Sequence, residues 1–316
     1  MLYSSACGGD ADHADAGSPA AYSGDDGASC GACSADYPCL TSDAGYTCRG
    51  QFSDWPPNFD VAMFQRNGDG TLSDARTGLV WQAVSDSGTY AWDDAKRYCD
   101  DLSLAGGAWR LPSEAELESI LDDVRSAPAL DPTLFPASAG AWSWSSSSYV
   151  GSSDTAWGVD FGEGFSDSAS VDDMKGVRCV RGGASGVVSS GSGDAPPGRY
   201  TIDHGTVYDN QTKLTWQQTL EENAYTLGDA TSYCASLTLA GGGFRMPTRA
   251  ELLSLVDRAK YEPAIDRAAF PNTPSAPFWS SSTFVATPTT NWFVSFVDGA
   301  SLNFDPSRLN HVRCVR

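Results

Sequence analysis

The chain of 316 residues has few of the residues on which most enzymes and nucleic-acid-binding proteins depend. Its only histidines, His13, His204 and His311, are scattered, and no catalytic triad, metal triad or phosphate-binding loop is present. Lys and Arg number 20 against 40 Asp and Glu, and the net charge of -20 opposes nucleic acid and anionic membranes as partners. No run approaches the ~18 apolar residues of a transmembrane helix. We therefore expect a protein that is not an enzyme, has no cofactor, binds no nucleic acid and has no transmembrane segment.

What the chain does have is enough apolar surface for real cores, since 41% of its residues are hydrophobic and ten are Trp. It also has nine cysteines, and their spacing is informative. Cys99 and Cys179 are 80 residues apart, and so are Cys234 and Cys314. A repeated interval predicts one long-range disulfide per repeat, which requires an oxidising compartment. We expect an extracellular or outer-surface location.

Four further cysteines, Cys30, Cys33, Cys39 and Cys48, lie in a short segment, 30–51, that has almost no apolar residues. Such a segment needs covalent staples to hold a shape. Two disulfides are favoured over a four-cysteine zinc site, because the second pair lacks the CxxC spacing of a zinc ribbon. The pairing of these four cysteines stays open.

Cys7 stands ahead of an acidic, small-residue tether that extends to residue 29. A cysteine in this position resembles a lipid attachment point, although Ser4 stands where Leu is usual, so a lipid anchor and a free cysteine both stay open. The first residues lack the basic and apolar regions of a signal peptide, and we expect any export signal to have been trimmed or to lie upstream.

The architecture is carried by an internal repeat. An offset of 135 residues superposes Trp81 on Trp216, Cys99 on Cys234, and the segment Val-Arg-Cys-Val-Arg that ends at residue 181 on the one that ends at residue 316. We predict one domain over 52–181 and a second over 199–316, joined by a Gly/Ser/Pro linker over 182–198. Because this linker offers little to bury, we expect the two domains to unfold almost independently.

Each copy predicts two helices followed by short strands. In copy one, Ala95, Tyr98, Cys99 and Leu102 lie on one helix face, and a second helix begins at a capping box of Ser113 and Glu116. Its buried stripe is predicted to contain Leu117, Ile120, Leu121 and Val124. Strands are expected at 142–150, 156–161 and 176–181, and the equivalent elements are expected in copy two. Helices before strands indicate an α+β fold, with two helices packed on a small, mostly antiparallel sheet.

These motifs, from NGDGTLSDARTGLVWQ through WRLPSEAEL, WSSS and AWGVDF to VRCVR, resemble the DUF1566 family, also named for the C-terminal domain of the Legionella collagen-like adhesin. The resemblance covers nearly all of both copies. It implies a fold similar to the C-type lectin and formylglycine-generating-enzyme superfamily, in exported bacterial proteins. For the named member it implies adhesion to sulfated glycans. Copy two departs from the pattern at its start, where it lacks the NGDG run.

Several residues are candidates for a site. Asn67, Asp69 and Asp74 offer oxygen ligands for calcium, although a hydrogen-bonded turn is favoured because the spacing is not that of an EF-hand. Four tryptophans alternate with small or polar residues on the expected strands, so most are expected in the core, although one or two near a sheet end could stack on a sugar; they are Trp144, Trp157, Trp279 and Trp292. The loops 162–176 and 297–311 differ most between the copies and could hold calcium or sugar hydroxyls. Their candidate ligands are Asp167, Asp172 and Asp173 in copy one and Asp298, Asn303 and Asp305 in copy two.

Two hypotheses follow for the function. The first is a non-enzymatic surface or secreted binding protein, adhesin-like, whose partner is an extracellular glycan or protein. The alternative is a structural subunit or protein-interaction component of a bacterial envelope or extracellular assembly. The sequence does not define the oligomeric state.

Overall fold

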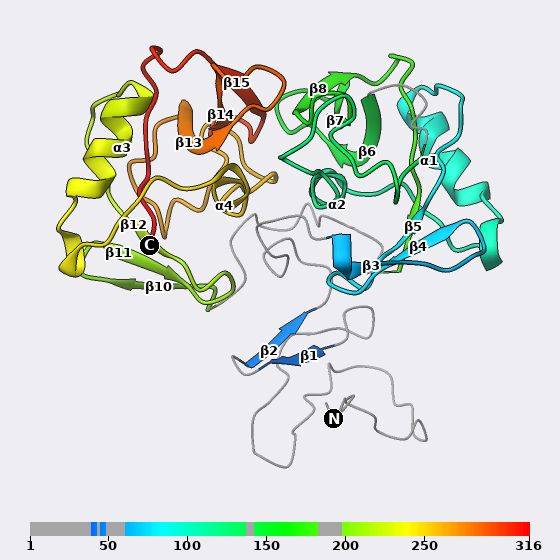
Figure 1. Ribbon diagram of the computed structural model, residues 1–316, viewed down its shortest axis with the longest axis horizontal. Coiled ribbons are helices and arrows are strands. Elements are labelled where there is room, and N and C mark those ends of the chain that lie inside the picture. The colour runs from blue at the N-terminus through cyan, green and yellow to red at the C-terminus, as the bar shows by residue number, and fades with distance from the viewer. Residues whose placement is uncertain (1–38, 43–44, 49–60, 137–141, 183–197) are drawn as a thin grey trace.

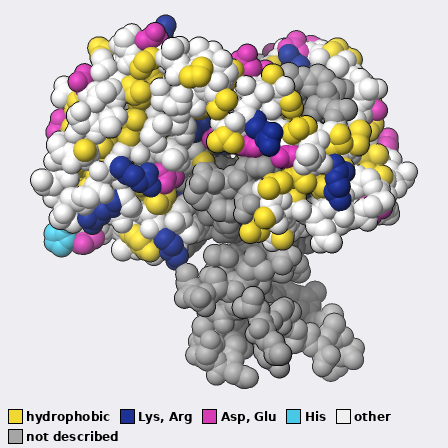
Figure 2. Space-filling model, in the orientation of Figure 1, with side chains coloured by type: hydrophobic (Ala, Val, Ile, Leu, Met, Phe, Trp, Pro, Cys, Tyr) yellow, Lys and Arg dark blue, Asp and Glu magenta, His cyan; other side chains and the backbone are white. Residues whose placement is uncertain are grey.

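In the computed structural model the described residues are 39–42, 45–48, 61–136, 142–182 and 198–316. Two similar lobes lie side by side, one for each copy of the repeat (Figure 1). Among the described residues no helix is long and apolar enough to cross a membrane. Acidic and basic side chains are interspersed over the face drawn in Figure 2.

Three short strands precede the helices in copy one. The elements of this lobe are the 3-10 helix η2 (Val61–Met63), β3 (Phe64–Arg66), β4 (Thr71–Asp74), β5 (Val80–Gln82), α1 (Trp92–Asp101), the 3-10 turn η3 (Leu104–Gly106), α2 (Glu114–Glu118), β6 (Trp142–Ser148), β7 (Thr155–Asp160), β8 (Ser166–Ser170) and β9 (Val180–Arg181).

Copy two repeats this order without a strand equivalent to β9. Its elements are β10 (Tyr200–Asp203), β11 (Thr206–Asp209), β12 (Thr215–Gln217), α3 (Leu227–Ser236), η4 (Leu239–Gly241), α4 (Arg249–Leu253), β13 (Pro277–Thr283), β14 (Asn291–Ser295) and β15 (Ser301–Phe304). The last segment is instead held by isolated bridges from Val315 to Trp216 and Arg245. The expectation that helices come before all strands is therefore wrong for both copies.

The sheets also differ from one small sheet per copy. Strands of both lobes form one antiparallel six-stranded sheet in the order β13-β14-β15-β8-β7-β6, and two smaller sheets have the orders β3-β4-β5-β9 and β10-β11-β12. β8 and β15 arise inside the two segments that were expected to be loops, and they pair at Ser166 and Ser301. The lobes are thus mixed α and β with antiparallel sheets, but they share their largest sheet.

The predicted first helix is confirmed, since Ala95 and Cys99 are buried on α1. The capping boxes that begin α2 and α4 are confirmed as well. The buried stripe of the second helix was predicted one turn too long. α2 ends at Glu118, and Val124 is 78% exposed. The Asp122 side chain accepts the Val124 backbone N–H in a turn, which replaces a further turn of helix.

Both long-range disulfides are present, Cys99–Cys179 and Cys234–Cys314, each with a sequence separation of 80. Each joins the first helix of its copy to the last segment, and the sulfurs lie in a core with Trp144 or Trp279. The N-terminal strands β1 (Cys39–Ser42) and β2 (Gly45–Cys48) pair with Cys39 opposite Cys48 in the backbone register. Cys7, Cys30 and Cys33 lie outside the described residues. Two disulfides among the N-terminal cysteines therefore stay a prediction, and both their pairing and lipidation of Cys7 stay open.

Each Val-Arg-Cys-Val-Arg segment also buries an arginine. Arg178 Nη1 donates to the backbone carbonyls of Gln82 and Ala83 at 2.7 and 2.9 Å, and its guanidinium lies over the Phe135 ring. Arg313 makes the equivalent contacts with Gln217, Gln218 and Phe270 in copy two. This side chain thus connects the end of β5 to Phe135 in copy one, and the end of β12 to Phe270 in copy two.

Candidate functional site

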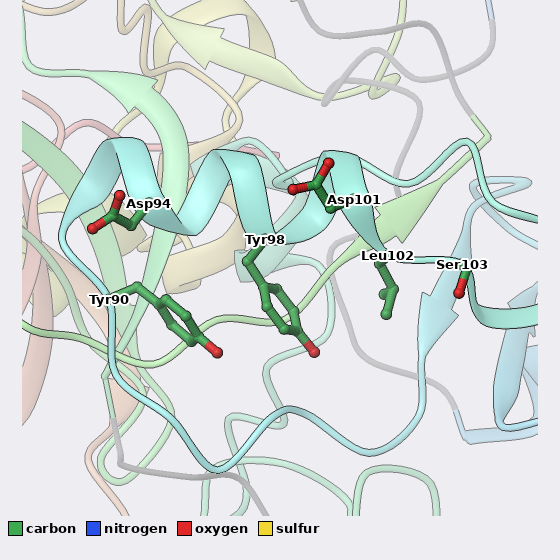
Figure 3. Close-up of a pocket in the computed structure, with 6 residues that line it drawn as sticks. All are labelled: Tyr90, Asp94, Tyr98, Asp101, Leu102 and Ser103. Atoms are coloured by element: carbon green, nitrogen blue, oxygen red, sulfur yellow. The ribbon is translucent and has the colours of Figure 1, made fainter.

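An open depression lies beside α1 in copy one (Figure 3). Its volume is about 530 Å³, which is within the usual size range of small-molecule sites. The rings of Tyr90 and Tyr98 lie next to each other on one side of the helix, with centroids 5.1 Å apart. Asp94 and Asp101 add carboxylates from the same helix, and Leu102 and Ser103 complete the lining.

The tyrosine pair is repeated in copy two. Tyr225 and Tyr233 are 135 residues after Tyr90 and Tyr98, and their rings stack with centroids 5.0 Å apart and an interplanar angle of 24°. Both Tyr98 and Tyr233 are half-buried. Figure 1 places α1 and α3 at opposite outer ends of the two lobes. The molecule therefore has one tyrosine pair in each lobe, next to helices that lie at opposite ends of the structure.

The first tyrosine of each pair is held by a buried tryptophan of the WSS motif. Trp144 Nε1 donates to the backbone oxygen of Tyr90 at 2.8 Å, and Trp279 Nε1 donates to that of Tyr225 at 2.9 Å. Both tryptophans are 0% exposed. A buried indole N–H needs an acceptor, and here that acceptor is the backbone of the half-buried tyrosine. These core tryptophans thus position the site.

A glutamine connects the second tyrosine to the disulfide. Gln217 Nε2 donates to the Tyr233 hydroxyl at 2.8 Å, and its Oε1 accepts the backbone N–H of Cys314 at 3.3 Å. In copy one Gln82 makes the same two bonds, at 3.4 Å to Tyr98 and 3.1 Å to Cys179. Because Tyr98 directly precedes Cys99 on α1, the disulfide-closed core sets the position of the tyrosine ring.

An acid beside each pair orients the first tyrosine. The Tyr90 hydroxyl donates to Asp86 Oδ2 at 2.7 Å, and this hydrogen bond raises the pKa of Tyr90 to about 12 and lowers the pKa of Asp86. In copy two the Tyr225 hydroxyl donates to Glu221 Oε2 at 3.2 Å. Partial burial is the main cause of the raised pKa of Tyr225, and the same holds for Tyr233. The raised pKa values keep the phenols of Tyr90, Tyr225 and Tyr233 neutral at physiological pH.

Sequence reasoning did not find these sites. Tyr98 and Tyr233 fall on the apolar helix stripe and were assigned to the buried face, while Tyr90 and Tyr225 precede the helix and were not singled out. The signal that could have found them is the repeat itself. Gln82, Asp86, Tyr90 and Asp94 are matched at the same offset by Gln217, Glu221, Tyr225 and Asp229, so the residues around the tyrosine pair recur in both copies.

The candidate calcium ligands form a hydrogen-bonded turn. Asp69 Oδ1 accepts the backbone N–H and the hydroxyl of Thr71, at 3.1 and 2.6 Å. Asp74 is buried, accepts the Thr77 hydroxyl at 2.8 Å and lies 3.5 Å from the Arg76 guanidinium. Asn67 donates to Thr71 and Ser73. Asp69 Oδ1 and both oxygens of Asp74 thus accept hydrogen bonds within the turn. The described residues hold no group of three His, Cys, Asp or Glu arranged for a metal ion.

Trp157 and Trp292 lie in the interior, exposed by 1% and 2%. The edge of Tyr149 packs on Trp157, and that of Phe284 packs on Trp292. The Arg249 guanidinium lies 4.0 Å from the centre of the Trp292 ring, and Arg258 lies 5.9 Å from that of Trp157. Their ring faces are therefore covered by protein and leave no room for a sugar.

The candidate residues of the two divergent segments are not brought together. Asp167 and Asp298 lie near each other where the lobes meet, and burial, with the Asp298 charge as a smaller cause, raises the pKa of Asp167. Asp172 and Asp173 are exposed in the turn after β8. Asn303 is on β15 and pairs with Trp292, while Asp305 caps the following turn at Ser307. No common ligand-binding surface includes all six.

These features define a class of protein: a tandem, disulfide-closed α+β domain that presents a tyrosine pair beside its first helix. The model of the Lcl C-terminal domain matches residues 70–181 and again residues 205–316. These matches cover more than half of the chain, and the chain belongs to this family. A comparison with curated proteins finds no match. Membership is in line with a secreted or surface protein.

Proposed function

We propose that the chain is a non-enzymatic surface or secreted binding protein whose two tyrosine pairs bind neutral saccharides. The observation that carries the proposal is the repeated tyrosine pair, supported in both copies by the same tryptophan, glutamine and acid. Paired aromatic rings provide an apolar platform for the C–H face of a sugar ring. Carboxylates beside the platform accept hydrogen bonds from sugar hydroxyls.

The charge of the depression narrows the ligand class. In copy one Asp86, Asp94 and Asp101 lie around the tyrosines, and the whole chain carries a net charge of -20. A sulfated or otherwise anionic glycan would meet repulsion there, whereas a neutral sugar would not. We therefore propose a neutral glycan, and binding of sulfated glycans is the contrasting outcome of the test.

The arrangement of the two tyrosine pairs favours an adhesive role. Because they lie at opposite ends of lobes that share a sheet, one short oligosaccharide does not reach both (Figure 1). A polymer or a glycan-coated surface does offer two attachment points, and the second attachment then benefits from a high effective concentration. We further propose an extracellular or outer-surface location, in line with the two disulfides, and a C-type-lectin-like relationship for each domain.

A glycan array with the labelled full chain, followed by calorimetry with the best neutral hit, tests the proposal. We expect two sites per chain in the native protein, one in Tyr98→Ala, one in Tyr233→Ala and none in the double variant. Each substitution should weaken its own site by at least about tenfold, as expected for a central aromatic contact. Tyr208→Ala is the matched control, since Tyr208 is an exposed tyrosine on β11, outside either tyrosine pair.

Stability must be followed in the same variants, because each tyrosine also packs on its neighbour. Tyr98→Phe and Tyr233→Phe keep the ring and should retain most of the affinity. If the double alanine variant is folded and still binds at two sites per chain, the tyrosine pairs are not the site. Binding to sulfated but not neutral glycans contradicts the assigned ligand class, and silence with all glycans favours a structural or protein-interaction role.

A further inference from the structure

The boundary between the lobes has the symmetry of a dimer interface, although both halves belong to one chain. Ser166 Oγ and Ser301 Oγ lie 3.2 Å apart, and these two serines occupy equivalent positions in the two copies. Glu114 contacts Arg258, and the residue equivalent to Glu114, Arg249, contacts Asp123, the residue equivalent to Arg258. Such reciprocal contacts are what a two-fold axis produces. We call this boundary, formed by β8, β15 and the residues of and after α2 and α4, the seam.

The charges at the reciprocal positions of the seam are separated by copy. Copy one supplies acids, with Arg258 Nη2 at 2.6 Å from Glu114 Oε1 and 3.0 Å from Glu118 Oε2. Copy two supplies arginines, and Arg249 Nη1 lies 2.8 Å from Asp123 Oδ1. Except for Asp123, which is 38% exposed, these side chains are almost completely withdrawn from solvent.

Arg249 also joins the seam to the backbone of the other copy. Its Nη2 donates to the Gly164 carbonyl oxygen and to the Ser301 hydroxyl, at 2.5 and 2.8 Å. Ser166 in turn donates to Glu118 Oε1 at 2.8 Å. The two serines therefore connect an arginine of copy two, Arg249, to a carboxyl group of copy one, Glu118. This polar network is not the same when the two copies are exchanged.

We infer that these charges make the seam specific for the pairing of copy one with copy two. Two copies of the first domain would place Glu114 against Asp123 at both reciprocal positions, and two copies of the second would place Arg249 against Arg258. Either arrangement buries like charges in contact, which disfavours the wrong partner strongly. The occupant of each half of the seam is thus the other copy, and in a tethered chain it is the other copy of the same molecule.

The charges of the seam also affect association between neighbouring molecules. β8 and β15 face each other across the seam and pair at Ser166 and Ser301, and sheet edges left uncovered are common sites of unwanted pairing. The charge pattern keeps identical domains of neighbouring molecules from using the same edges. It also holds the two tyrosine pairs in one relative orientation. The inference does not depend on what those pairs bind.

The test uses the full chain with a protease site placed within residues 183–197, cleaved after purification and analysed by size exclusion and native mass spectrometry. We expect the native halves to stay together as a one-to-one complex, with no pairs of identical halves. In Glu114→Arg/Asp123→Arg the halves should separate, with affinity lower by on the order of a hundredfold or more. Asp93→Arg/Asp100→Arg is the matched control, since it changes two exposed acids of α1 and should leave the complex intact.

Exchange of the charges between the copies provides the rescue. Glu114→Arg, Glu118→Leu and Asp123→Arg combined with Arg249→Glu, Leu253→Glu and Arg258→Asp should fold and restore the one-to-one complex. Far-ultraviolet circular dichroism and disulfide mapping report folding of each half. Failure of the exchanged chain to fold, or undiminished association of folded halves in the Glu114→Arg/Asp123→Arg protein, overturns the inference. Pairs of identical halves in the native protein overturn it as well.

Discussion

The outer faces of the two lobes and the seam between them have opposite relationships to the repeat. At the outer faces the copies agree, since each tyrosine pair has the same tryptophan, glutamine and acid behind it. At the seam they differ in the sign of charge, as Glu114 and Asp123 are replaced by Arg249 and Arg258. Two surfaces with the same residues are suited to two ligands of the same kind, whereas two surfaces of opposite charge are suited to each other. The outer faces therefore suit a repeated ligand, and the seam suits a pair of unlike halves.

The same comparison changes the expected unfolding behaviour. A flexible linker alone favoured nearly independent domains, but the lobes share a six-stranded sheet and buried ion pairs. Unfolding one lobe would expose the other half of the seam, with its charges left unpaired. We therefore expect the lobes to unfold together, so that a destabilising substitution in one copy lowers the stability of both lobes.

Removal of a disulfide should have the largest effect. Cys99→Ala/Cys179→Ala and Cys234→Ala/Cys314→Ala each open a loop whose ends are 80 residues apart, and each should lower the free energy of unfolding by roughly 4 kcal/mol. Urea titration followed by Trp fluorescence measures this. A single shifted transition in both variants supports coupled lobes, whereas one shifted and one unshifted transition would restore the idea of independent domains.

Loss of a buried arginine should come next. Arg313→Met leaves the carbonyl oxygens of Gln217 and Gln218 and the Thr273 hydroxyl without their donor, and should cost roughly 3 kcal/mol. Arg178→Met should cost a similar amount in copy one. Arg97→Met, at an exposed position on α1, is the control and should change little. Thermal melts report the difference, and equal stability of Arg313→Met and Arg97→Met would refute the structural role of this motif.

The third effect should depend on pH and on copy. Burial raises the pKa of Glu118 to about 7, against the opposing charge of Arg249, whereas the equivalent position in copy two is Leu253, which does not titrate. The folded state then keeps a proton that the unfolded state releases above its ordinary pKa of 4.5. Stability from this group is present at low pH and is lost as the pH rises from about 4.5 to about 7.

Glu118→Gln should remove that slope, which we expect to amount to about 2 kcal/mol between the ends of the window. Chemical unfolding at several pH values measures it in both proteins. Glu222→Gln, an exposed acid before α3, serves as the control and should leave the slope unchanged. A native protein whose stability rises with pH through this window, and a variant that behaves likewise, would show that Glu118 is ionised in the folded state.

What could be predicted from the sequence was local or repeated. The capping boxes follow from residues three apart, the α1 stripe from helical spacing, and the disulfides from an interval found twice. The seam could not be predicted in this way, because β8 and β15 lie in segments without strand-like alternation and meet across the lobes at a single residue pair, Ser166 and Ser301. The replacement of acids in copy one by arginines in copy two could be read from the aligned repeat. That these acids and arginines form ion pairs with each other could be learned only from the structure.

The candidate site was missed for a related reason. Helical spacing assigns Tyr98 to the same face as Ala95 and Cys99, yet it does not distinguish the centre of a buried face from its edge, where a ring is half in contact with solvent. Trp157 and Trp292 were placed on the right strands, but alternation on a strand does not reveal that the other face of the sheet is covered too. The segments 162–176 and 297–311 were chosen as candidate sites because their sequences differ between the copies, whereas the tyrosine pairs are candidates because they are the same in both copies.

The smallest effect should be on sugar affinity, and it should come from a carboxylate that is present beside the tyrosine pair of copy one and absent from copy two. Asp101 lines the depression of copy one, and the equivalent residue of copy two is Ser236, whose hydroxyl donates to the Tyr233 carbonyl oxygen on its own helix. If carboxylates beside the tyrosines accept sugar hydroxyls, copy two lacks one such acceptor. Copy two should then be the weaker of the two sites for a neutral sugar. Ser236→Asp should strengthen it by a few-fold, equivalent to about 1 kcal/mol, the usual net value of one hydrogen bond. Calorimetry in a Tyr98→Ala background isolates the copy-two site, and Ser232→Asp, one turn earlier on α3, provides a control with the same added charge. Equal strengthening by both substitutions would mean that charge in general, not an acceptor at the position of Asp101, sets the affinity.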